Sequence, residues 1–203
     1  MAPRDTGMAL QPGVRVQRST RELPILHLEP QIPSHGAVGL IVEGLVADVC
    51  SWSIAEIHAM PREQRVWDLN CVWGWTRHGC RWQGIPASRV IDAAGPLSAA
   101  SFVLAGAAGG SYSSCFTIET ARESLLAWRL DEADLTAEHG WPLRLVPPPT
   151  KWAYKGVKWV NRLTLIERFT PGFWEELVGD PNGDIPADVI DHRRTLDSEE
   201  ENL

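Results

Sequence analysis

The sequence predicts an α+β domain built on a mixed, mostly antiparallel sheet with short helices. Short apolar runs rich in β-branched residues recur along the 203 residues, and brief helix signals are interleaved with them. No segment has the long, regular crossover helix of a doubly wound parallel sheet, and no internal repeat is visible. These observations favour α+β over α/β.

The first half of the chain contains two strong strand signals with a short helix between them. Residues 38–46 are apolar and β-branched, and residues 66–73 form the second predicted strand. Ser53 and Glu56 have the spacing of a capping box, in which each side chain accepts a backbone N–H of the other residue. The helix that begins there is expected to end before Pro61.

The second half continues the same alternation. Helices are expected from Ser88 to Gly95, from a second capping box at Thr120 to about residue 130, and after Thr170, which a proline follows. The intervening apolar runs predict strands at residues 101–107, 115–119, 143–146 and 157–169.

Length and charge set the domain organisation. A chain of 203 residues supports one full hydrophobic core. We expect a flexible N-terminal arm over residues 1–22, an ordered domain over 23–178, and an acidic, partly disordered tail over 179–203. The formal net charge of −7 provides no field that would attract nucleic acid, so a nucleic-acid partner is not expected.

Cysteine usage indicates the compartment. The four cysteines, at positions 50, 71, 80 and 115, form no CxxC pair, which disfavours a structural zinc site. A chain of this size does not depend on disulfides, so the spacing favours reduced thiols and a cytoplasmic location. The first thirty residues contain no apolar run of seven or more, so neither an ordinary secretion signal nor a membrane span is expected.

Several common site motifs are missing from the sequence. The glycines within residues 106–110 lack both the lysine of a P-loop and the GxGxxG spacing of a dinucleotide site. No GxSxG nucleophile elbow occurs. The six histidines show neither HxH nor HExxH spacing. The candidate chemistry must therefore come from other residues.

Cys71 is the first candidate functional residue. It lies near the end of a predicted strand and is followed by Val-Trp-Gly-Trp, in a chain with ten tryptophans but only two tyrosines. One interpretation is a buried core thiol. The other is a thiolate that ligates a cofactor metal, since a cysteine is usually retained for its reactivity rather than for its packing. The local sequence leaves both interpretations open.

Two later segments carry groups that bind anions. In residues 139–144 (HGWPLR), a histidine and an arginine flank a glycine and a proline. In residues 151–159 (KWAYKGVKW), three lysines surround a glycine, so that ammonium groups and backbone amides could meet on one phosphate. The alternative for the lysines is a solvated strand edge, which lysine often protects.

Taken in order, these motifs make the chain resemble the sulfite oxidase-like molybdopterin oxidoreductase family, especially its short, haem-free bacterial and archaeal members. The resemblance extends from about residue 23 to residue 174. The matching motifs are LPxLH (23–27), IVEGLV (41–46), CVWGW (71–75), WQGIP (82–86), LTAEHGWPLRLV (135–146), KGVKWV (155–160) and PGFWEE (171–176).

The resemblance implies a sulfite oxidase-type molybdopterin-binding fold and a set of site residues. A molybdenum ion would be held by a pyranopterin dithiolene and by the thiolate of Cys71, a soft ligand that suits such a metal. His139 and Arg144 would contact the pterin and its phosphate. The other expected cofactor contacts are Gly156, Val157 and Lys158 at the phosphate end, Lys151 and Lys155 as supporting charges, and Asn70 by its position next to the cysteine.

The resemblance also implies an activity. The expected reaction is two-electron oxygen-atom transfer on a small sulfite- or sulfoxide-like substrate, with electrons exchanged with an external carrier and without haem. Substrate-pocket candidates are Trp73, Trp75, Arg77 and Trp82, each with an alternative as a core or surface residue. The alternative function is that of a cofactor-free descendant of the same fold, acting as a binding protein or a non-redox enzyme.

Overall fold

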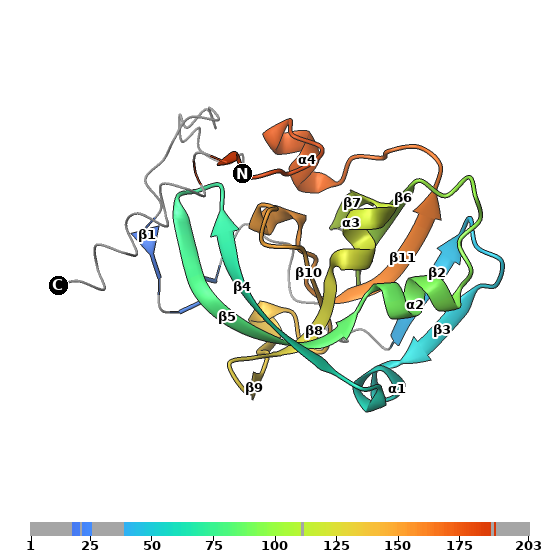
Figure 1. The fold of residues 1–203 in the computed structure, drawn as a ribbon, viewed down its shortest axis with the longest axis horizontal. Coiled ribbons are helices and arrows are strands. Elements are labelled where there is room, and N and C mark those ends of the chain that lie inside the picture. The colour runs from blue at the N-terminus through green and yellow to red at the C-terminus, as the bar shows by residue number, and fades with distance from the viewer. Residues whose placement is uncertain (1–17, 21, 26–38, 111, 188, 190–203) are drawn as a thin grey trace.

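The computed structural model describes residues 18–20, 22–25, 39–110, 112–187 and 189, which fold around two β-sheets with short helices at their edges (Figure 1). Most strand pairs are antiparallel, as the sequence predicts. No helix among these residues is long and apolar enough to cross a membrane. The larger part of the predicted arm, residues 1–17, lies outside the described residues, as does His27 of the LPxLH motif.

The first sheet has five strands in the order β3-β2-β11-β6-β7. The strands are β3 (Cys50–Ser53), β2 (Gly39–Gly44), β11 (Val160–Ile166), β6 (Phe102–Ala107) and β7 (Ser113–Thr117). The β2–β11 pair is parallel and the other pairs are antiparallel. Side chains along β6 alternate between buried and half-buried, which is the pattern of a strand with one face on the core.

The second sheet has six strands and centres on a long hairpin. In it β4 (Glu63–Cys71) pairs with β5 (Trp75–Pro86), and the order continues through β8 (Leu125–Leu130) and β10 (Arg144–Val146). Two short strands complete the sheet: β1 (Arg18–Ser19) pairs with β5 in parallel, and β9 (Ala133–Asp134) pairs with β8.

The helix predicted from a capping box at Thr120 to about residue 130 is wrong in its cap and in its second half. Helix α3 covers Ile118–Glu123, with the hydroxyl of Thr117 accepting from Thr120 N, and the chain then enters β8. The first four residues of β8 are all buried, between β5 and β10. A continuous apolar run of this length does not distinguish a buried strand from a buried helix.

The other helices are short, and one of three predicted caps forms. The Ser53–Glu56 capping box starts α1 (Ile54–Ala59), as expected. Helix α2 (Ser88–Ala93) has Ala87 rather than Ser88 at its N-cap, without a side-chain cap. Helix α4 (Phe173–Val178) begins after Gly172 rather than after Thr170, because the Glu175 carboxylate accepts from Gly172 N at 2.6 Å.

The segment after α4 is attached to the domain as far as the structure describes it. Gly183 O accepts from Trp152 N, and Ile185 N donates to Thr150 O. The side chain of Ile185 is buried. Residues 190–203, which complete the predicted acidic tail, lie outside the described residues.

Candidate active site

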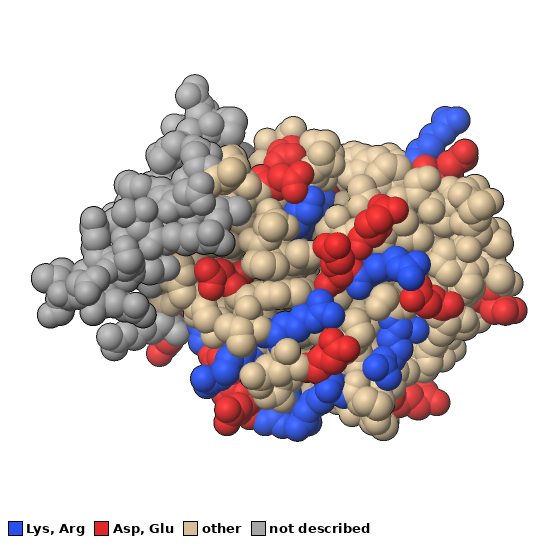
Figure 2. Space-filling model, in the orientation of Figure 1, with Lys and Arg blue, Asp and Glu red and all other residues tan. Residues whose placement is uncertain are grey.

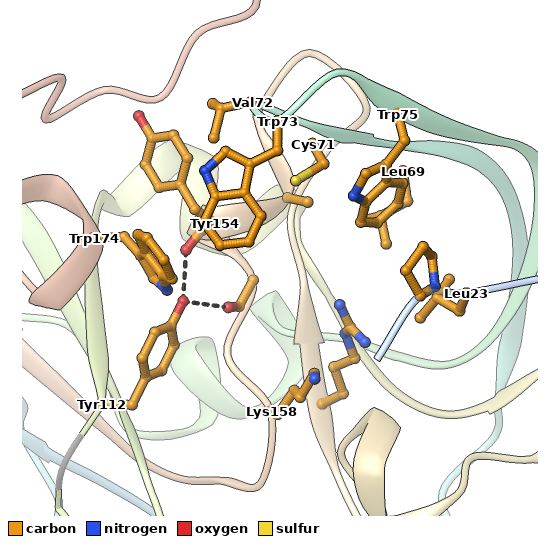
Figure 3. A pocket seen from close by; sticks show the side chains of 14 residues that line it. Leu23, Leu69, Cys71, Val72, Trp73, Trp75, Tyr112, Tyr154, Lys158 and Trp174 are labelled. Carbon is orange, nitrogen blue, oxygen red and sulfur yellow. Dashed lines mark hydrogen bonds between the residues drawn. The ribbon is translucent and has the colours of Figure 1, made fainter. Parts of the chain in front are cut away.

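A cavity opens where the two sheets, α4 and the loops around residues 150–158 converge (Figure 3). It encloses about 590 Å³ of empty space, part of it open to solvent. Residues from segments far apart in the sequence line it, among them six that the sequence predicts as site residues: Cys71, Trp73, Trp75, Arg144, Gly156 and Lys158.

The β4–β5 hairpin places Cys71 at this cavity. Cys71 is the last residue of β4 and pairs with Trp75 at the start of β5. The three intervening residues form a tight turn, in which Gly74 N donates to Cys71 O and Gly74 has a φ of +87° that favours glycine. The side chain of Cys71 is 5% exposed, and its sulfur points toward the cavity in Figure 3.

Asn70 supports this turn from behind and does not line the cavity. It is 2% exposed, and its Oδ1 accepts from the Thr76 hydroxyl at 2.9 Å across the hairpin. Its Nδ2 donates to Pro149 O at 3.4 Å. Asn70, which precedes Cys71, therefore ties the hairpin to the loop that precedes the lysine segment.

Aromatic rings form the wall beside the thiol. The rings of Trp73 and Trp174 meet edge to face, with centroids 5.6 Å apart. Tyr112 and Tyr154 also line the cavity, and the Tyr112 hydroxyl lies 2.7 Å from Tyr154 O and 3.0 Å from Gly156 O. Of these four aromatic residues, the sequence predicted only Trp73 as a site residue. Trp174 lies within the matching PGFWEE motif, which was the available signal for it.

Cationic groups occupy another part of the cavity. Arg144, on β10, is 4% exposed; its guanidinium lies 5.4 Å from the centroid of the Trp82 ring and donates to His139 O at 3.1 Å. In Figure 3, Lys158 lies across the cavity from Cys71. No aspartate or glutamate is among the described residues that line the cavity. The site therefore favours an anion.

His139 lies next to these cations and is neutral. Burial lowers its pKa to about 4, and the charges of Arg144 and Lys158 act in the same direction. Its Nδ1 is buried and has no hydrogen-bond partner among the described residues. The adjacent Gly140 has a φ of +107°, and a Cβ there would approach Lys158 Cα and Arg144 Cβ to 3.1 and 3.2 Å. The loop thus needs glycine to bring these groups together.

Lys151 and Lys155 do not reach the cavity. Lys155 is 1% exposed and donates to Glu175 Oε1, Cys115 O and Pro181 O. Lys151 pairs with Asp184 at 2.6 Å. Both lysines instead line a second, smaller hollow, together with residues of β7 and of the segment after α4. They brace the cavity wall from outside.

The remaining predicted residues lie beneath or beside the cavity. Trp82 is fully buried under Arg144, so it supports the guanidinium and does not line the cavity. Arg77 forms an ion pair with Asp131 and donates to Cys80 Sγ at 3.0 Å. Val157 is fully buried, and its backbone bridges to Leu145.

The described residues contain no cluster of three or more histidine, cysteine or acidic side chains that could hold a metal ion on their own. A metal here would need most of its ligands from a non-protein group, with Cys71 as the protein ligand. The cation cluster and the buried, unsatisfied His139 Nδ1 fit a bound organic anion that carries a hydrogen-bond donor.

Residues 29–174 match the family model described as oxidoreductase molybdopterin binding domain. The chain belongs to this family. The predicted family, the predicted molybdopterin-binding fold and the predicted enzyme class, an oxidoreductase, are thereby confirmed.

Two relatives agree with this assignment. The chain is 34% identical over 175 residues to the uncharacterized oxidoreductase YuiH of Bacillus subtilis (strain 168), covering 81% of this chain and 86% of YuiH. It is 32% identical over 139 residues to YedZ1 of Azospira oryzae, named as a candidate protein-methionine-sulfoxide reductase subunit, covering 68% of this chain and 52% of that protein. The chain therefore spans about half the length of YedZ1.

The fold is similar to that of the sulfane dehydrogenase SoxCD from Paracoccus pantotrophus. The TM-score is 0.58 with 22% sequence identity, over 70% of this chain and 40% of the SoxCD chain. At this identity the likeness concerns the fold alone.

Proposed function

We propose that this family member holds a molybdenum–molybdopterin cofactor in the cavity with Cys71 as the protein ligand, and that it transfers oxygen atoms to or from a small, uncharged sulfur compound. The observation that carries the proposal is the division of the cavity. A single thiol lies beside an apolar aromatic wall, Lys158 lies across the cavity from it (Figure 3), and Arg144 also lines the cavity.

The cationic groups suit the pterin and phosphate end of such a cofactor. Arg144 and Lys158 would bind the phosphate, and the backbone around Gly156 would complete its surroundings. Neutral His139 would accept a pterin N–H at its buried Nδ1. The bound cofactor supplies two-electron oxygen-atom transfer, which no side chain provides.

The chain's own residues line the cavity and hold the cysteine in place. The rings of Trp73 and Trp174 meet edge to face and give the cavity an apolar wall. Asn70 and Thr76 lock the hairpin that carries Cys71, so the sulfur is held before any ligand binds. Tyr112 ties together the carbonyls of Tyr154 and Gly156 in the facing loop.

The surroundings of the thiol favour an uncharged substrate over sulfite. The labelled side chains around Cys71 in Figure 3 are Leu69, Val72, Trp73 and Trp75, none of which is charged, and Lys158 lies across the cavity from it. A sulfite anion would need a cation next to the reacting centre, whereas a sulfoxide or thioether fits an apolar, aromatic wall. The name of the relative YedZ1, a candidate protein-methionine-sulfoxide reductase subunit, supports the same substrate class.

An external electron carrier completes the reaction. Reduction of a sulfoxide takes up two electrons and two protons and gives a thioether and water, and the reverse reaction releases them. The proposed enzyme carries no haem of its own. We also propose a cytoplasmic location, because none of the four cysteines is in a disulfide.

Steady-state assays of the molybdenum-loaded enzyme test the substrate class. With small dyes as electron donor or acceptor, we expect turnover of methyl p-tolyl sulfoxide or its thioether and little turnover of sulfite. Turnover of sulfite alone would contradict the proposed substrate. The cofactor-free alternative predicts neither molybdenum nor pterin fluorescence in protein made by a host that synthesises molybdopterin.

A further inference from the structure

The outer face of α4 exposes two large apolar side chains. Phe173 is 47% exposed and Leu177 is 60% exposed. They are four residues apart, so they lie on the same side of the helix. Trp174 and Glu175, on the other side, are buried against the domain. Together they form a small exposed apolar patch on the helix.

This face is connected to the cavity through packed rings. The Trp174 ring lines the cavity and contacts the Trp73 ring, with centroids 5.6 Å apart. It also contacts the exposed Phe173 ring, with centroids 5.3 Å apart. A continuous path of aromatic rings therefore leads from Trp73, two positions after Cys71, to Phe173 at the protein surface.

The surroundings of α4 are acidic. Glu176 is exposed and Asp180 is half-exposed, and residues 171–187 contain no lysine or arginine. Figure 2 shows acidic side chains on the surface over α4. The other two acids of this segment are paired, Asp184 with Lys151 and the buried Glu175 with Lys155. The face therefore combines an apolar centre with a negative rim.

We propose that this face of α4 docks a basic, one-electron carrier protein, and that electrons pass between the carrier and the cavity by way of Phe173, Trp174 and Trp73. The inference rests on the proposed redox function. Two electrons leave the reduced holoenzyme one at a time, and each converts one ferric haem of a carrier to ferrous; the opposite flow reverses both steps.

The size of the patch fits such a partner better than a second copy of this chain. Transient complexes between redox proteins bury small interfaces. Complementary charge raises their association rate more than their affinity. A stable homodimer needs a much larger apolar area than two exposed side chains supply. Two negative rims would also repel each other.

Stopped-flow mixing of the dithionite-reduced holoenzyme with ferricytochrome c, a basic haem protein, tests the proposal. We expect the second-order rate constant to fall about 10-fold or more in the double variant Phe173→Ala/Leu177→Ala. Glu176→Lys should lower it several-fold and weaken its dependence on salt. Reduction of the small dye dichlorophenolindophenol should be unchanged in both variants.

The matched control changes an exposed apolar and an acidic residue at the opposite edge of the five-stranded sheet. Asp48→Lys/Val49→Ala, next to β3, should leave both rates unchanged; Val49 is 69% exposed. Equal cytochrome rates in the α4 variants and the wild type would overturn the inference. So would a parallel loss of dye reduction, or a shift from dimer to monomer in the α4 variants. Failure of the wild type to reduce the dye would instead overturn the proposed function.

Discussion

The ammonium of Lys155 lies 2.5 Å from the carboxylate of Glu175, and both side chains are 1% exposed. The same carboxylate accepts from the Ser114 hydroxyl at 2.6 Å and from Cys115 N at 3.0 Å. Each partner of the pair is adjacent in sequence to a residue that lines the cavity: Tyr154 and Gly156 flank Lys155, and Trp174 precedes Glu175. The buried pair therefore joins β7, α4 and the residue 153–156 loop behind the cavity wall.

Removal of one charge from this pair should destabilise the protein strongly. Lys155→Met leaves the Glu175 carboxylate buried without its counter-charge, and we expect a loss of about 3–5 kcal/mol in the free energy of unfolding. Lys151→Met, which breaks a pair whose aspartate is 62% exposed, should cost about 1 kcal/mol or less. Urea unfolding of both variants measures the difference. Equal losses would contradict the structural role given to Lys155.

His139 should titrate near pH 4 in the cofactor-free protein, because burial and the charges of Arg144 and Lys158 lower its pKa. Its ordinary pKa is 6.5, so between these values the unfolded chain binds more protons than the folded one. The free energy of unfolding should therefore fall as the pH drops from 6.5 to about 4. It should fall less in His139→Gln.

Nuclear magnetic resonance of the His139 ring, assigned by comparison with His139→Gln, measures this titration. Addition of pyrophosphate should raise the pKa, because a bound anion offsets the neighbouring cations. A midpoint near the ordinary value in the cofactor-free protein would contradict the described cluster.

Arg144→Met should weaken retention of the cofactor. Hydrogen bonds to charged groups contribute about 1.5–3 kcal/mol, which corresponds to about 10- to 100-fold in affinity. The pKa of His139 should rise in the same variant, since one of the charges that lower it is gone. Pterin content after gel filtration and the His139 titration provide two separate readouts.

Arg162→Met is the matched control for Arg144→Met. Arg162 is on β11 and forms an ion pair with Glu43. The Arg162 side chain is 47% exposed and does not line the cavity. We expect wild-type pterin content in this variant. A similar loss in both arginine variants would point to a general effect of charge and not to a contact made by Arg144.

Local sequence patterns predicted the elements that depend on nearby residues. The Ser53–Glu56 capping box forms because its hydrogen bonds join residues three positions apart. The strands around Leu104 and Leu163 were predicted from their local runs of apolar residues, although their hydrogen bonds come from distant strands. The helix expected after Thr120 gave way to β8, because pairing with β5 and β10 decides the conformation of that apolar run. The long strand β5 was not predicted, since polar residues and glycines interrupt it.

The sequence predicted the residues that line the cavity better than the residues that support its wall. Cys71, Arg144 and Lys158 meet at the cavity, as the ordered motifs imply. The three lysines of residues 151–159 looked equivalent in the sequence. Lys155, however, forms a buried ion pair with Glu175, twenty residues downstream. Such a pairing depends on the tertiary fold and leaves no local signal.

The molybdenum content of the wild type, Cys71→Ser and Cys50→Ser, all made in a host that synthesises molybdopterin, tests the central claim most directly. Cys50 is half-buried and does not line the cavity, so its variant controls for loss of a thiol. We predict about one molybdenum per chain in the wild type and in Cys50→Ser. X-ray absorption should show loss of the metal, or one sulfur ligand fewer, in Cys71→Ser. An unchanged metal content with an unchanged sulfur shell in Cys71→Ser would contradict the assignment of Cys71 as the ligand.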